Sequence, residues 1–419
     1  MKKLVSGLVL TLLLINISAL TFNIQQARSE PATWIVDDDG QADFHTIQEA
    51  INASKNGDTI LVMPGAYCEN LYVDKSVRLL AKNQSATIIS KTKDVGSTVR
   101  IIARNASIIG FTIKGGAAGI FLHGKKDQPV KTIVKRNRVV DCSYGIYVYW
   151  SNGSVIADNI VENNTKGIFV YWSSARILKN TVRNNKYGIY LDGSRISTVE
   201  NNLIEDNKYG VFIDYLSCNR IYRNNFIDNN CNAYVNEETE SIWNSSFPFI
   251  GNYWSNYNGT DADHDGIGDE PYIINKNNVD NYPLMGMFSR FNASFGYFID
   301  VISNSTINDF RYYEYNSTIV IHASSITADQ AYGFCRLTIP HGLMPPPYNI
   351  TINGNLVKYK TVFENEMLSV IYFSYKYPRL KMGIPPEFLL AFLSLILISI
   401  VLVILVIKKK LPERPRESE

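Results

Sequence analysis

The middle of the chain contains a repeat of 21 or 22 residues. Four copies read YGIYVYW, KGIFVYW, YGIYLDG and YGVFIDY, and a looser copy, AGIFLHG, precedes them around Gly119. Their shared glycines are Gly145, Gly167, Gly188 and Gly210. Eight residues before each of these glycines stands an asparagine: Asn137, Asn159, Asn180 and Asn202. Asn225 continues the series, with Ala233 at the position of the glycine. Two landmarks in register identify a repeat architecture.

Each copy has room for three short strands. After the glycine, apolar residues alternate with aromatic or polar ones, which indicates a strand with one face inward. Two further apolar segments complete the copy, so turns of only two or three residues remain, too short for a crossover helix. The expected fold is therefore an all-β parallel β-helix with three strands per coil, each pairing with its equivalent about 4.8 Å away. The asparagines form a ladder at a corner, where Asn tolerates the left-handed backbone.

An N-terminal cap is predicted in front of the coils. Thr46 and Glu49 form a Thr-x-x-Glu capping box, which opens a short helix with Ile47, Ala50 and Ile51 on one face. Such a helix covers the open end of the first coil and blocks edge pairing. We place the cap and the β-helix together at residues 32–250.

Several segments resemble known β-helix proteins. Asp43–Asn83 closely resembles the N-terminal coil and cap of pectin-lyase-like proteins, and the repeats with Gly251–Met285 resemble the NosD-type branch found in archaeal surface proteins. Phe334–Met344 and Pro347–Tyr359 resemble a small β domain that precedes a membrane anchor. The resemblance implies a right-handed β-helix at the cell surface. It implies no single activity, because the superfamily contains lyases, hydrolases, epimerases and non-catalytic binders. The 5 His and 7 Met are scattered, which argues against copper.

Both ends of the chain predict export. Residues 1–29 read as a signal peptide, with Lys2 and Lys3 before an apolar run; an uncleaved anchor is the alternative. Residues 388–407 carry no charge and are long enough for one transmembrane helix, with a buried core helix or a processed sorting signal as alternatives. The basic segment 408–419 is then a cytoplasmic tail, and the bulk of the protein is extracellular. With 41 Lys and Arg against 39 Asp and Glu, nothing favours nucleic acid as a partner.

The segment 251–287 contains the candidate metal site. Aspartates alternate through Asp261, Asp263 and Asp265, and glycine permits a sharp turn, as in oxygen-ligand calcium loops. The predicted Ca²⁺ ligands are the side chains of Asp261, Asp263, Asp265 and Asp269, the carbonyl of Ile267, and Asp280 as a ligand from outside the loop. Ca²⁺ there would be structural; the alternative is a solvated acidic turn.

The outward positions of the repeat are the candidate binding surface. Stacked coils place aromatic residues beside two carboxylates, and aromatic rings with acidic groups suit carbohydrate. The candidate residues are Tyr147, Tyr149, Trp150, Phe169, Tyr171, Trp172, Tyr190, Asp192 and Asp214. Asp192 and Asp214 are also candidate catalytic residues, because a close carboxylate pair suits a retaining glycosidase. The alternative is that the aromatic columns only stabilise the stack.

Residues 288–383 are expected to form a small antiparallel β-sandwich-like domain. Asn353-Gly354, between two apolar strands, predicts a hairpin. Five cysteines leave at least one thiol unpaired, although Cys218 and Cys231 could bridge neighbouring coils. The favoured function is non-catalytic binding of carbohydrate or envelope partners, with a polysaccharide-active enzyme and a purely structural envelope component as alternatives. The sequence does not indicate an oligomeric state.

Overall fold

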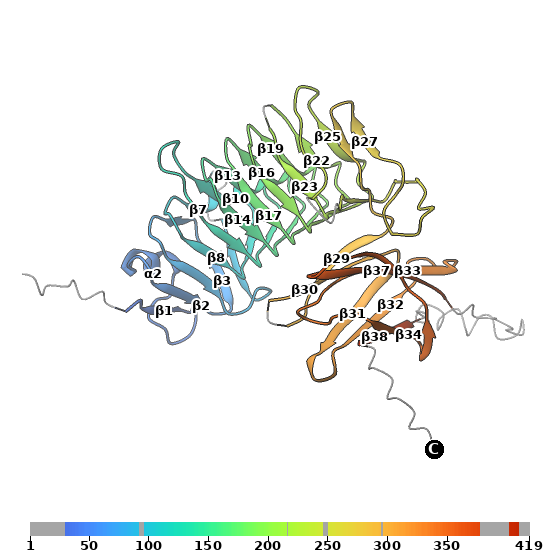
Figure 1. Cartoon of the computed structure of the whole chain (residues 1–419). Coiled ribbons are helices and arrows are strands. Elements are labelled where there is room, and N and C mark those ends of the chain that lie inside the picture. Colours follow the sequence, from blue (N-terminus) through green and yellow to red (C-terminus); the bar gives the residue numbers. More distant parts are fainter. Residues whose placement is uncertain are drawn as a thin grey trace, which may run out of the picture.

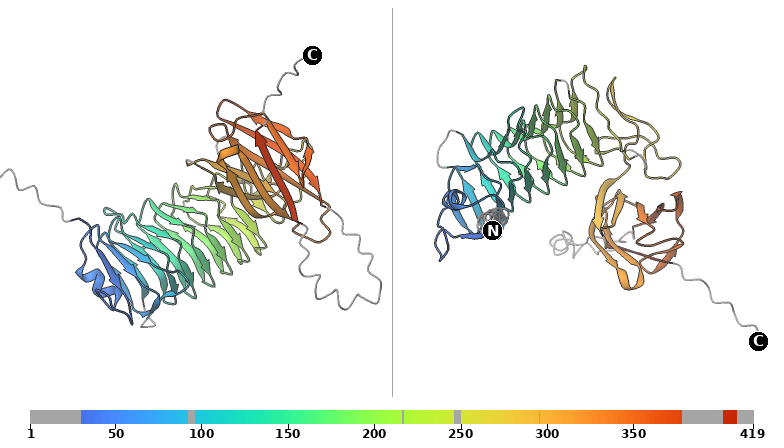
Figure 2. Two further views of the ribbon diagram at one scale, coloured as in Figure 1. Left: turned by 90° about the horizontal axis from the view of Figure 1, so that it is seen from below. Right: turned by 60° about the vertical axis from the view of Figure 1, so that its left-hand side comes forward.

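The computed structural model describes residues 30–91, 96–215, 217–245, 250–294 and 296–377, together with the backbone of 402–409. The chain winds into a right-handed parallel β-helix of about nine turns, which confirms the predicted fold class for this part. Figure 1 shows an elongated stack of coils, with a separate β domain beside its C-terminal end, and Figure 2 shows the same two parts from other sides.

Three parallel sheets form the walls of the β-helix. Sheet A contains β1 (Thr33–Val36), β2 (Thr59–Val62), β5 (Arg78–Ala81), β8 (Ser107–Ile109), β11 (Ile133–Lys135), β14 (Ser154–Ala157), β17 (Ala175–Leu178), β20 (Thr198–Glu200) and β23 (Arg220–Tyr222). Sheet B contains β3 (Gly65–Cys68), β6 (Thr87–Ser90), β9 (Thr112–Lys114), β12 (Arg138–Val140), β15 (Ile160–Glu162), β18 (Thr181–Arg183), β21 (Leu203–Glu205), β24 (Asn225–Ile227) and β26 (Tyr253–Trp254). Sheet C contains β4 (Leu71–Val73), β7 (Ser97–Ile101), β10 (Ala118–His123), β13 (Tyr144–Tyr149), β16 (Lys166–Tyr171), β19 (Tyr187–Asp192), β22 (Tyr209–Ile213) and β25 (Cys231–Val235).

The repeat copies stack in the predicted register. Tyr147 pairs with Phe169, Phe169 with Tyr190, and Tyr190 with Phe212. The alternating apolar residues point inward and are fully buried: Ile146, Val148, Ile168, Val170, Ile189, Leu191, Val211 and Ile213. The coil is therefore held by continuous aliphatic columns.

The last copy needs a correction of one residue. Tyr209 pairs with Cys231 and Val211 with Ala233, so the position of the repeat glycine falls on Asn232 and not on Ala233. The ladder residue is accordingly Asn224, which is buried, whereas Asn225 begins β24. Two adjacent asparagines allowed either alignment, and the missing glycine removed the landmark that distinguishes them.

A first asparagine ladder runs through the corner between sheets A and B. Its members are Asn137, Asn159, Asn180, Asn202, Asn224 and Asn252. Each side-chain oxygen accepts hydrogen bonds from the backbone N–H and the amide of the member before it, at 2.9–3.2 Å for the inner pairs. The ladder thus satisfies the buried polar groups of a tight corner.

The prediction that the ladder asparagines adopt the left-handed backbone conformation is wrong. This conformation belongs to the residue before each of them: Arg136, Asp158, Lys179, Asn201 and Arg223. The preceding residue makes the turn, which directs the asparagine inward. Asparagine is needed for its paired donor and acceptor and not for its backbone.

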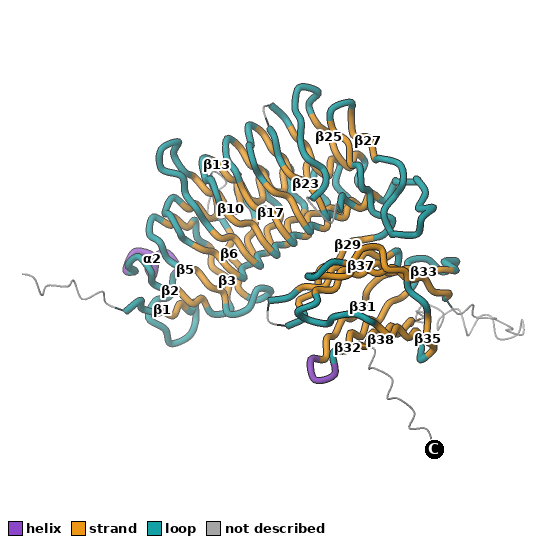
Figure 3. The backbone as a smooth tube through the Cα atoms, viewed as in Figure 1, coloured by secondary structure: helices purple, strands orange, loops and turns teal. Residues whose placement is uncertain are grey.

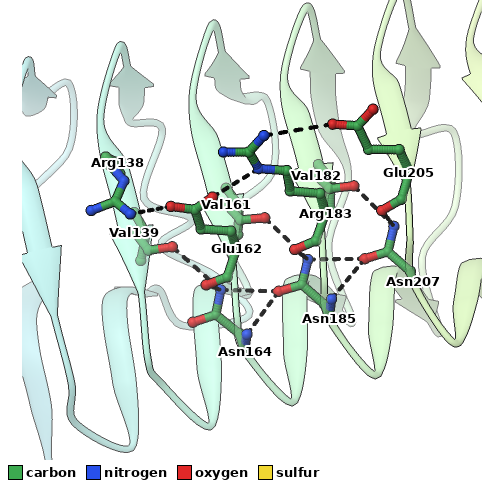
Figure 4. A network of polar contacts seen from close by, with 10 residues as sticks. All are labelled: Arg138, Val139, Val161, Glu162, Asn164, Val182, Arg183, Asn185, Glu205 and Asn207. Atoms are coloured by element: carbon green, nitrogen blue, oxygen red, sulfur yellow. Dashed lines mark hydrogen bonds and ion pairs between the residues drawn. The ribbon is translucent and has the colours of Figure 1, made fainter. Parts of the chain in front are cut away.

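A second asparagine ladder, at the corner between sheets B and C, consists of Asn164, Asn185, Asn207 and Asn229. Figure 4 shows three of these residues beside a row of alternating charges on sheet B, formed by Arg138, Glu162, Arg183 and Glu205. Burial tends to raise the pKa of Glu162, but hydrogen bonds from Arg183 and Arg138 lower it overall. Because the charges alternate, each side chain in this row attracts the oppositely charged side chain on the next coil.

The predicted N-terminal cap is present. Helix α2 (Ile47–Ala53) buries Ile47, Ala50 and Ile51, and the Thr46 hydroxyl accepts a hydrogen bond from Glu49 N. It packs against β1, β2 and β4. The carboxylate of Glu69 also accepts bonds from the first N–H groups of the helix, at Ile47 and Gln48. These contacts join the cap to the first coils.

The C-terminal end of the β-helix is closed by aromatic residues and a hairpin. Trp254 stacks on Phe226 and Tyr272, with ring centroids 4.3 and 4.2 Å apart. The hairpin consists of β27 (Tyr272–Asn275) and β28 (Asn278–Asp280). Trp243 is buried beside it and donates a hydrogen bond to Asn278.

The C-terminal domain consists of two antiparallel sheets that share one core. The first contains β29 (Met287–Asn292), β30 (Phe298–Ser303), β33 (Tyr332–Pro340), β36 (Lys360–Glu364) and β37 (Leu368–Lys376). The second contains β31 (Thr306–Tyr313), β32 (Thr318–Ser324), β34 (Tyr348–Ile352), β35 (Asn355–Val357) and β38 (Leu402–Lys409), and the 3₁₀ turn η1 (Glu314–Asn316) joins β31 to β32. In Figure 3 this domain consists of orange strands joined by teal loops, with the turn η1 in purple. The expected hairpin forms between β34 and β35.

The end of the predicted transmembrane helix is a strand. Residues 388–401 lie outside the described residues, but 402–407 belong to β38, which pairs with both β32 and β34. A short apolar run rich in Val and Ile suits an inner strand as well as a helix, and periodicity alone cannot distinguish them. No helix within the described part of the chain is long and apolar enough to cross a bilayer. The five cysteines are all free, so Cys218 and Cys231 do not form the bridge considered above.

Candidate functional site

The outer face of sheet C carries three columns of side chains. The ring column is Phe121, Tyr147, Phe169, Tyr190, Phe212 and Tyr234. The edge column is His123, Tyr149, Tyr171, Asp192 and Asp214. The corner column is Gly124, Trp150, Trp172, Gly193 and Tyr215. In Figure 1 the labels of these strands lie along the upper edge, and the C-terminal domain lies below.

Most rings of the ring column cover one another. Tyr147 stacks on Phe121 at 4.7 Å with planes 8° apart, and on Phe169 at 4.9 Å with planes 15° apart. Phe169 is only 6% exposed. Burial raises the pKa of Tyr147 to about 12, so its hydroxyl stays protonated. These rings present edges and not faces to solvent, which favours the structural role that had been the alternative for this column.

The two candidate carboxylates lie beside a lysine that sequence reasoning had not selected. The ammonium of Lys166 lies 3.9 Å from the ring centroids of both Phe169 and Tyr190. Burial lowers the pKa of Lys166, and the charges of Asp192 and Asp214 oppose this shift. The signal was visible in the repeat, because Lys166 occupies the position held by tyrosine in the other three copies.

The carboxylate of Asp214 is held in place by hydrogen bonds, whereas burial and neighbouring charges shift the pKa of Asp192. Asp214 accepts bonds from the Tyr190 hydroxyl at 3.2 Å, from Tyr215 N at 3.0 Å and from the Asn236 amide at 3.4 Å. Burial and the neighbouring charge of Asp214 raise the pKa of Asp192, while Lys166 opposes the rise. The pair therefore combines one fixed carboxylate with one that binds a proton more readily than usual.

Only half of the predicted calcium ligands come together. Within the described residues, the carboxylates of Asp261, Asp263 and Asp265 offer oxygen atoms within 4.8 Å of one another. Asp269 instead accepts a hydrogen bond from Ala262 N at 2.8 Å, and Ile267 forms an antiparallel bridge with Leu284. Three carboxylates in one turn are a partial oxygen-ligand set.

Asp280 is not part of this group, which corrects its prediction as a ligand. Its buried carboxylate ends the first asparagine ladder and accepts bonds from Asn252 N, the Asn252 amide, Trp254 Nε1 and Tyr282 N at 2.7–3.2 Å. Burial raises its pKa to about 6. An acidic residue at this place replaces the next asparagine of the ladder.

Two cations of the C-terminal domain contact the acidic turn. Arg336 donates to the Asp265 carbonyl at 2.7 Å and to its carboxylate at 3.0 Å, and Lys360 forms an ion pair with Asp263 at 3.7 Å. Neither partner was predicted. A further acidic group, Asp37, Asp38 and Asp39, gathers near the N-terminal coil and had also been overlooked, although three consecutive aspartates mark it in the sequence.

Part of the β-helix is similar in sequence to known proteins. Residues 51–259 match the family described as "Periplasmic copper-binding protein (NosD)". An 81-residue stretch is 42% identical to a "Cell surface glycoprotein" of Methanothermus fervidus, covering 19% of this chain and 13% of that protein. The match thus spans a small part of that relative.

Solved structures with a similar arrangement of strands have low sequence identity to this chain and low TM-scores. Pectate lyase Pel9A has a TM-score of 0.41 and 14% identity over 55% of this chain and 72% of its own. Pectin methylesterase PemA from Erwinia chrysanthemi has a TM-score of 0.38 and 15% identity over 50% of this chain and 82% of its own. Similarities at this level carry no argument about activity. The family match and the stacked three-strand coils nevertheless agree, and the chain contains a β-helix similar to that of the NosD family.

Proposed function

We propose that this protein is exposed at the cell surface and binds carbohydrate of the envelope, without catalysis, through the outer face of sheet C. The relative named a cell surface glycoprotein, the periplasmic description of the family and the predicted signal peptide at 1–29 support an extracellular location.

The observation that carries the proposal is the meeting of aromatic and charged columns on one outer face of the β-helix. Tyr171 is followed in its column by Asp192 and Asp214, with Lys166 beside them. Rings for apolar contact next to groups that hold hydroxyls are the composition of a sugar site.

A glycan array tests this function directly. We expect the purified full chain, in mild detergent, to bind a subset of envelope glycans, and the double variant Tyr149→Ala/Asp214→Asn to lose that binding. Arg176→Ala, on the exposed face of sheet A, is the matched control and is expected to bind normally. Absence of binding to every glycan would favour a purely structural envelope component.

The enzyme alternative rests on the carboxylate pair. Asp192, with its raised pKa, next to Asp214 resembles the division between an acid and its partner in carbohydrate-cleaving enzymes. A polysaccharide lyase or hydrolase would release shortened products, and this release would collapse in Asp192→Asn. Intact glycan after long incubation with the wild-type chain would exclude that reading for the glycan tested.

We also propose that Asp261, Asp263 and Asp265 bind a structural Ca²⁺. Hard carboxylate oxygens within 4.8 Å of one another support this. Chelator is expected to expose protease sites near residues 255–282, and Asp263→Asn to show that exposure without chelator. A digestion pattern unchanged by chelator would contradict the proposal.

A single-pass anchor at 388–407 completes the proposal. Such a helix requires residues 402–407 to leave β38, since one backbone cannot form both structures. The full chain is expected to stay with membranes after alkaline extraction, and a chain ending at Tyr377 to be released. Release of both forms would exclude the anchor.

A further inference from the structure

One stretch of the β-helix is far more basic than the rest of the chain. Residues 75–138 contain 14 Lys and Arg against 2 Asp and Glu, although the whole chain has 41 against 39. The stretch runs through the strands from β5 to β12, in the coils that follow the N-terminal cap. Cations at this density repel one another and attract anions from solution, so the surface here is strongly electropositive.

Five of these cations lie where sheet C meets the corner toward sheet A. We call them the basic corner: Arg100, Arg104, Lys125, Lys126 and Lys131. The two arginines belong to β7 or follow it, and the three lysines stand in the loop between β10 and β11 of the next coil. Asn105 N donates to the Lys131 carbonyl at 2.8 Å, which joins the two coils at this corner. All five side chains are exposed.

The cations of the basic corner are not neutralised by the protein. Among the residues that the structure describes, none of the five forms an ion pair, not even with Asp127 of the same loop; ion pairs engage Lys135 and Arg138 instead. The acidic group near the N-terminal coil lies at a different corner, since Asp38 accepts a hydrogen bond from Ala66 N at the start of sheet B.

His123 shows how these charges act on their surroundings. Burial lowers the pKa of His123, and the charges of Arg100 and Lys125 lower it further. The guanidinium of Arg100 contacts Nδ1 of His123, and because a guanidinium can only donate, this imidazole nitrogen accepts and the ring is neutral. The same guanidinium lies 5.7 Å from the ring centroid of Phe121. Arg100 is thereby held at the beginning of the ring column.

We propose that the basic corner binds the sulfate or phosphate esters of an anionic envelope glycan. This inference rests on the proposed function and adds a charged subsite at one end of the same face. Arg100 is in register with Phe121 of the ring column, so a glycan that lies along sheet C can extend onto the corner.

The arrangement of the cations favours a polymer with closely spaced anions. Arg104 and Lys131 stand on adjacent coils, and coils are about 4.8 Å apart, so a linear polymer along the corner meets a cation on each coil. Lysine ammonium groups act as point charges and suit sulfate or phosphate oxygens, whereas a planar carboxylate is matched best by an arginine fork. The fork of Arg100 already contacts His123. The density of charge on the polymer should therefore decide affinity.

Calorimetric titration of the full chain in mild detergent tests this preference. Dextran sulfate supplies dense ester charge, polygalacturonate supplies carboxylates, and unmodified dextran lacks charge. We expect dextran sulfate to bind at least about tenfold more tightly than polygalacturonate and dextran. Raising the salt concentration from about 0.05 M to about 0.5 M should weaken dextran sulfate at least about tenfold, because exposed charges are screened.

Charge-matched variants locate the site. The first replaces three lysines of the basic corner, Lys125→Gln/Lys126→Gln/Lys131→Gln. It should weaken dextran sulfate on the order of 100-fold, at about fivefold for each cation removed. The control removes three exposed lysines from other places, Lys186→Gln/Lys208→Gln/Lys358→Gln, and should change binding less than about threefold. Circular dichroism verifies folding; where the first variant is not folded, Lys126→Gln alone should weaken binding about fivefold.

The outcomes separate this inference from the proposed function. An equal loss in the control variant would mean that only net charge matters, and would overturn the basic corner as a site. Single-stranded DNA or anionic phosphatidylglycerol vesicles that bind as tightly, and lose binding in the first variant, would overturn the assignment to a glycan.

The glycan array provides the remaining distinction. Failure of dextran sulfate to bind, with a positive array, overturns the charged subsite and leaves carbohydrate binding intact. Failure of dextran sulfate together with an empty array overturns both. The variant Tyr149→Ala/Asp214→Asn leaves the basic corner unchanged and should keep its binding of dextran sulfate.

Discussion

At the scale of single residues, the role of Asp280 follows from its position at the end of the first asparagine ladder and not from its acidic side chain. The ladder spacing lengthens to 28 residues from Asn224 to Asn252 and again from Asn252 to Asp280, because loops enter the last turns. An acidic residue near an acidic loop suggested a metal ligand. The structure places it instead under four N–H donors in the closed end of the β-helix.

The buried carboxylate of Asp280 predicts a pH effect on stability. Its folded pKa of about 6 lies above the value near 4 of an unfolded chain, so burial penalises the charged form. The penalty is full above about pH 6 and disappears below about pH 4. Relative to Asp280→Asn, the wild-type free energy of unfolding should therefore rise as pH falls from 7 to 4, by roughly 3 kcal/mol at about 1.4 kcal/mol per pKa unit. Denaturant unfolding followed by tryptophan fluorescence measures this, and a difference that stays constant with pH would contradict it.

The repeat glycines are required by close packing. Gly188 has no left-handed backbone, but a Cβ there would lie 2.6 Å from the carbonyl of Gly210 and 3.1 Å from the Asn207 amide. We expect Gly188→Ala to lower the free energy of unfolding by about 1–3 kcal/mol, since backbone must shift to admit the methyl group. Lys186→Ala, at an exposed position nearby, should change it by less than about 0.5 kcal/mol. Equal unfolding midpoints for the two variants in denaturant would show that the position of Gly188 tolerates a side chain.

At the scale of elements, the coil could be predicted because its signal is repeated. The alternation of apolar residues and the regular spacing of the repeat glycines predicted the strands, their register and their stacking. The second ladder was missed because Asn164, Asn185 and Asn207 stand among many other asparagines, and only hydrogen bonding distinguishes inward from outward amides. The strand β38 was missed because a run of Val, Ile and Leu suits either structure, and its partners are far away in the sequence.

Removing one rung of the first ladder should be costly. The Asn180 side chain accepts from Asn159 and donates to the Ile156 carbonyl and to Asn202. Asn180→Ala leaves several buried polar groups without partners, and we expect a loss of about 3 kcal/mol in the free energy of unfolding. The control is Arg176→Ala: the Arg176 side chain is exposed, and its 3.4 Å ion pair with the less exposed Glu200 should contribute about 1 kcal/mol or less. A loss in Asn180→Ala no larger than in this control would mean that the ladder adds little.

At the scale of the whole molecule, the C-terminal domain is held against the β-helix by contacts that no local pattern could predict. Asn225 exchanges two hydrogen bonds with the backbone of Phe288, at 2.8 and 2.9 Å, and Arg336 reaches an aspartate 71 residues earlier in the chain. These contacts lie at the corner between sheets A and B and at the acidic turn. The strands of sheet C lie on the side of the β-helix away from the C-terminal domain in Figure 1.

Asp300 is the most informative residue of this junction. It binds Arg290 through two hydrogen bonds of 2.6 and 2.7 Å and lies 3.9 Å from Arg223 of the β-helix. Asp300→Asn removes the nearest anion of two largely buried guanidinium groups, which should destabilise the junction by about 3 kcal/mol and speed proteolysis between residues 281 and 286. Asp309→Asn, which removes an exposed ion pair of the same domain, is the matched control and should be cleaved like the wild type. Since sheet C lies away from the junction, glycan binding should survive in the Asp300→Asn chain; its loss would mean that the domain supports the binding surface after all.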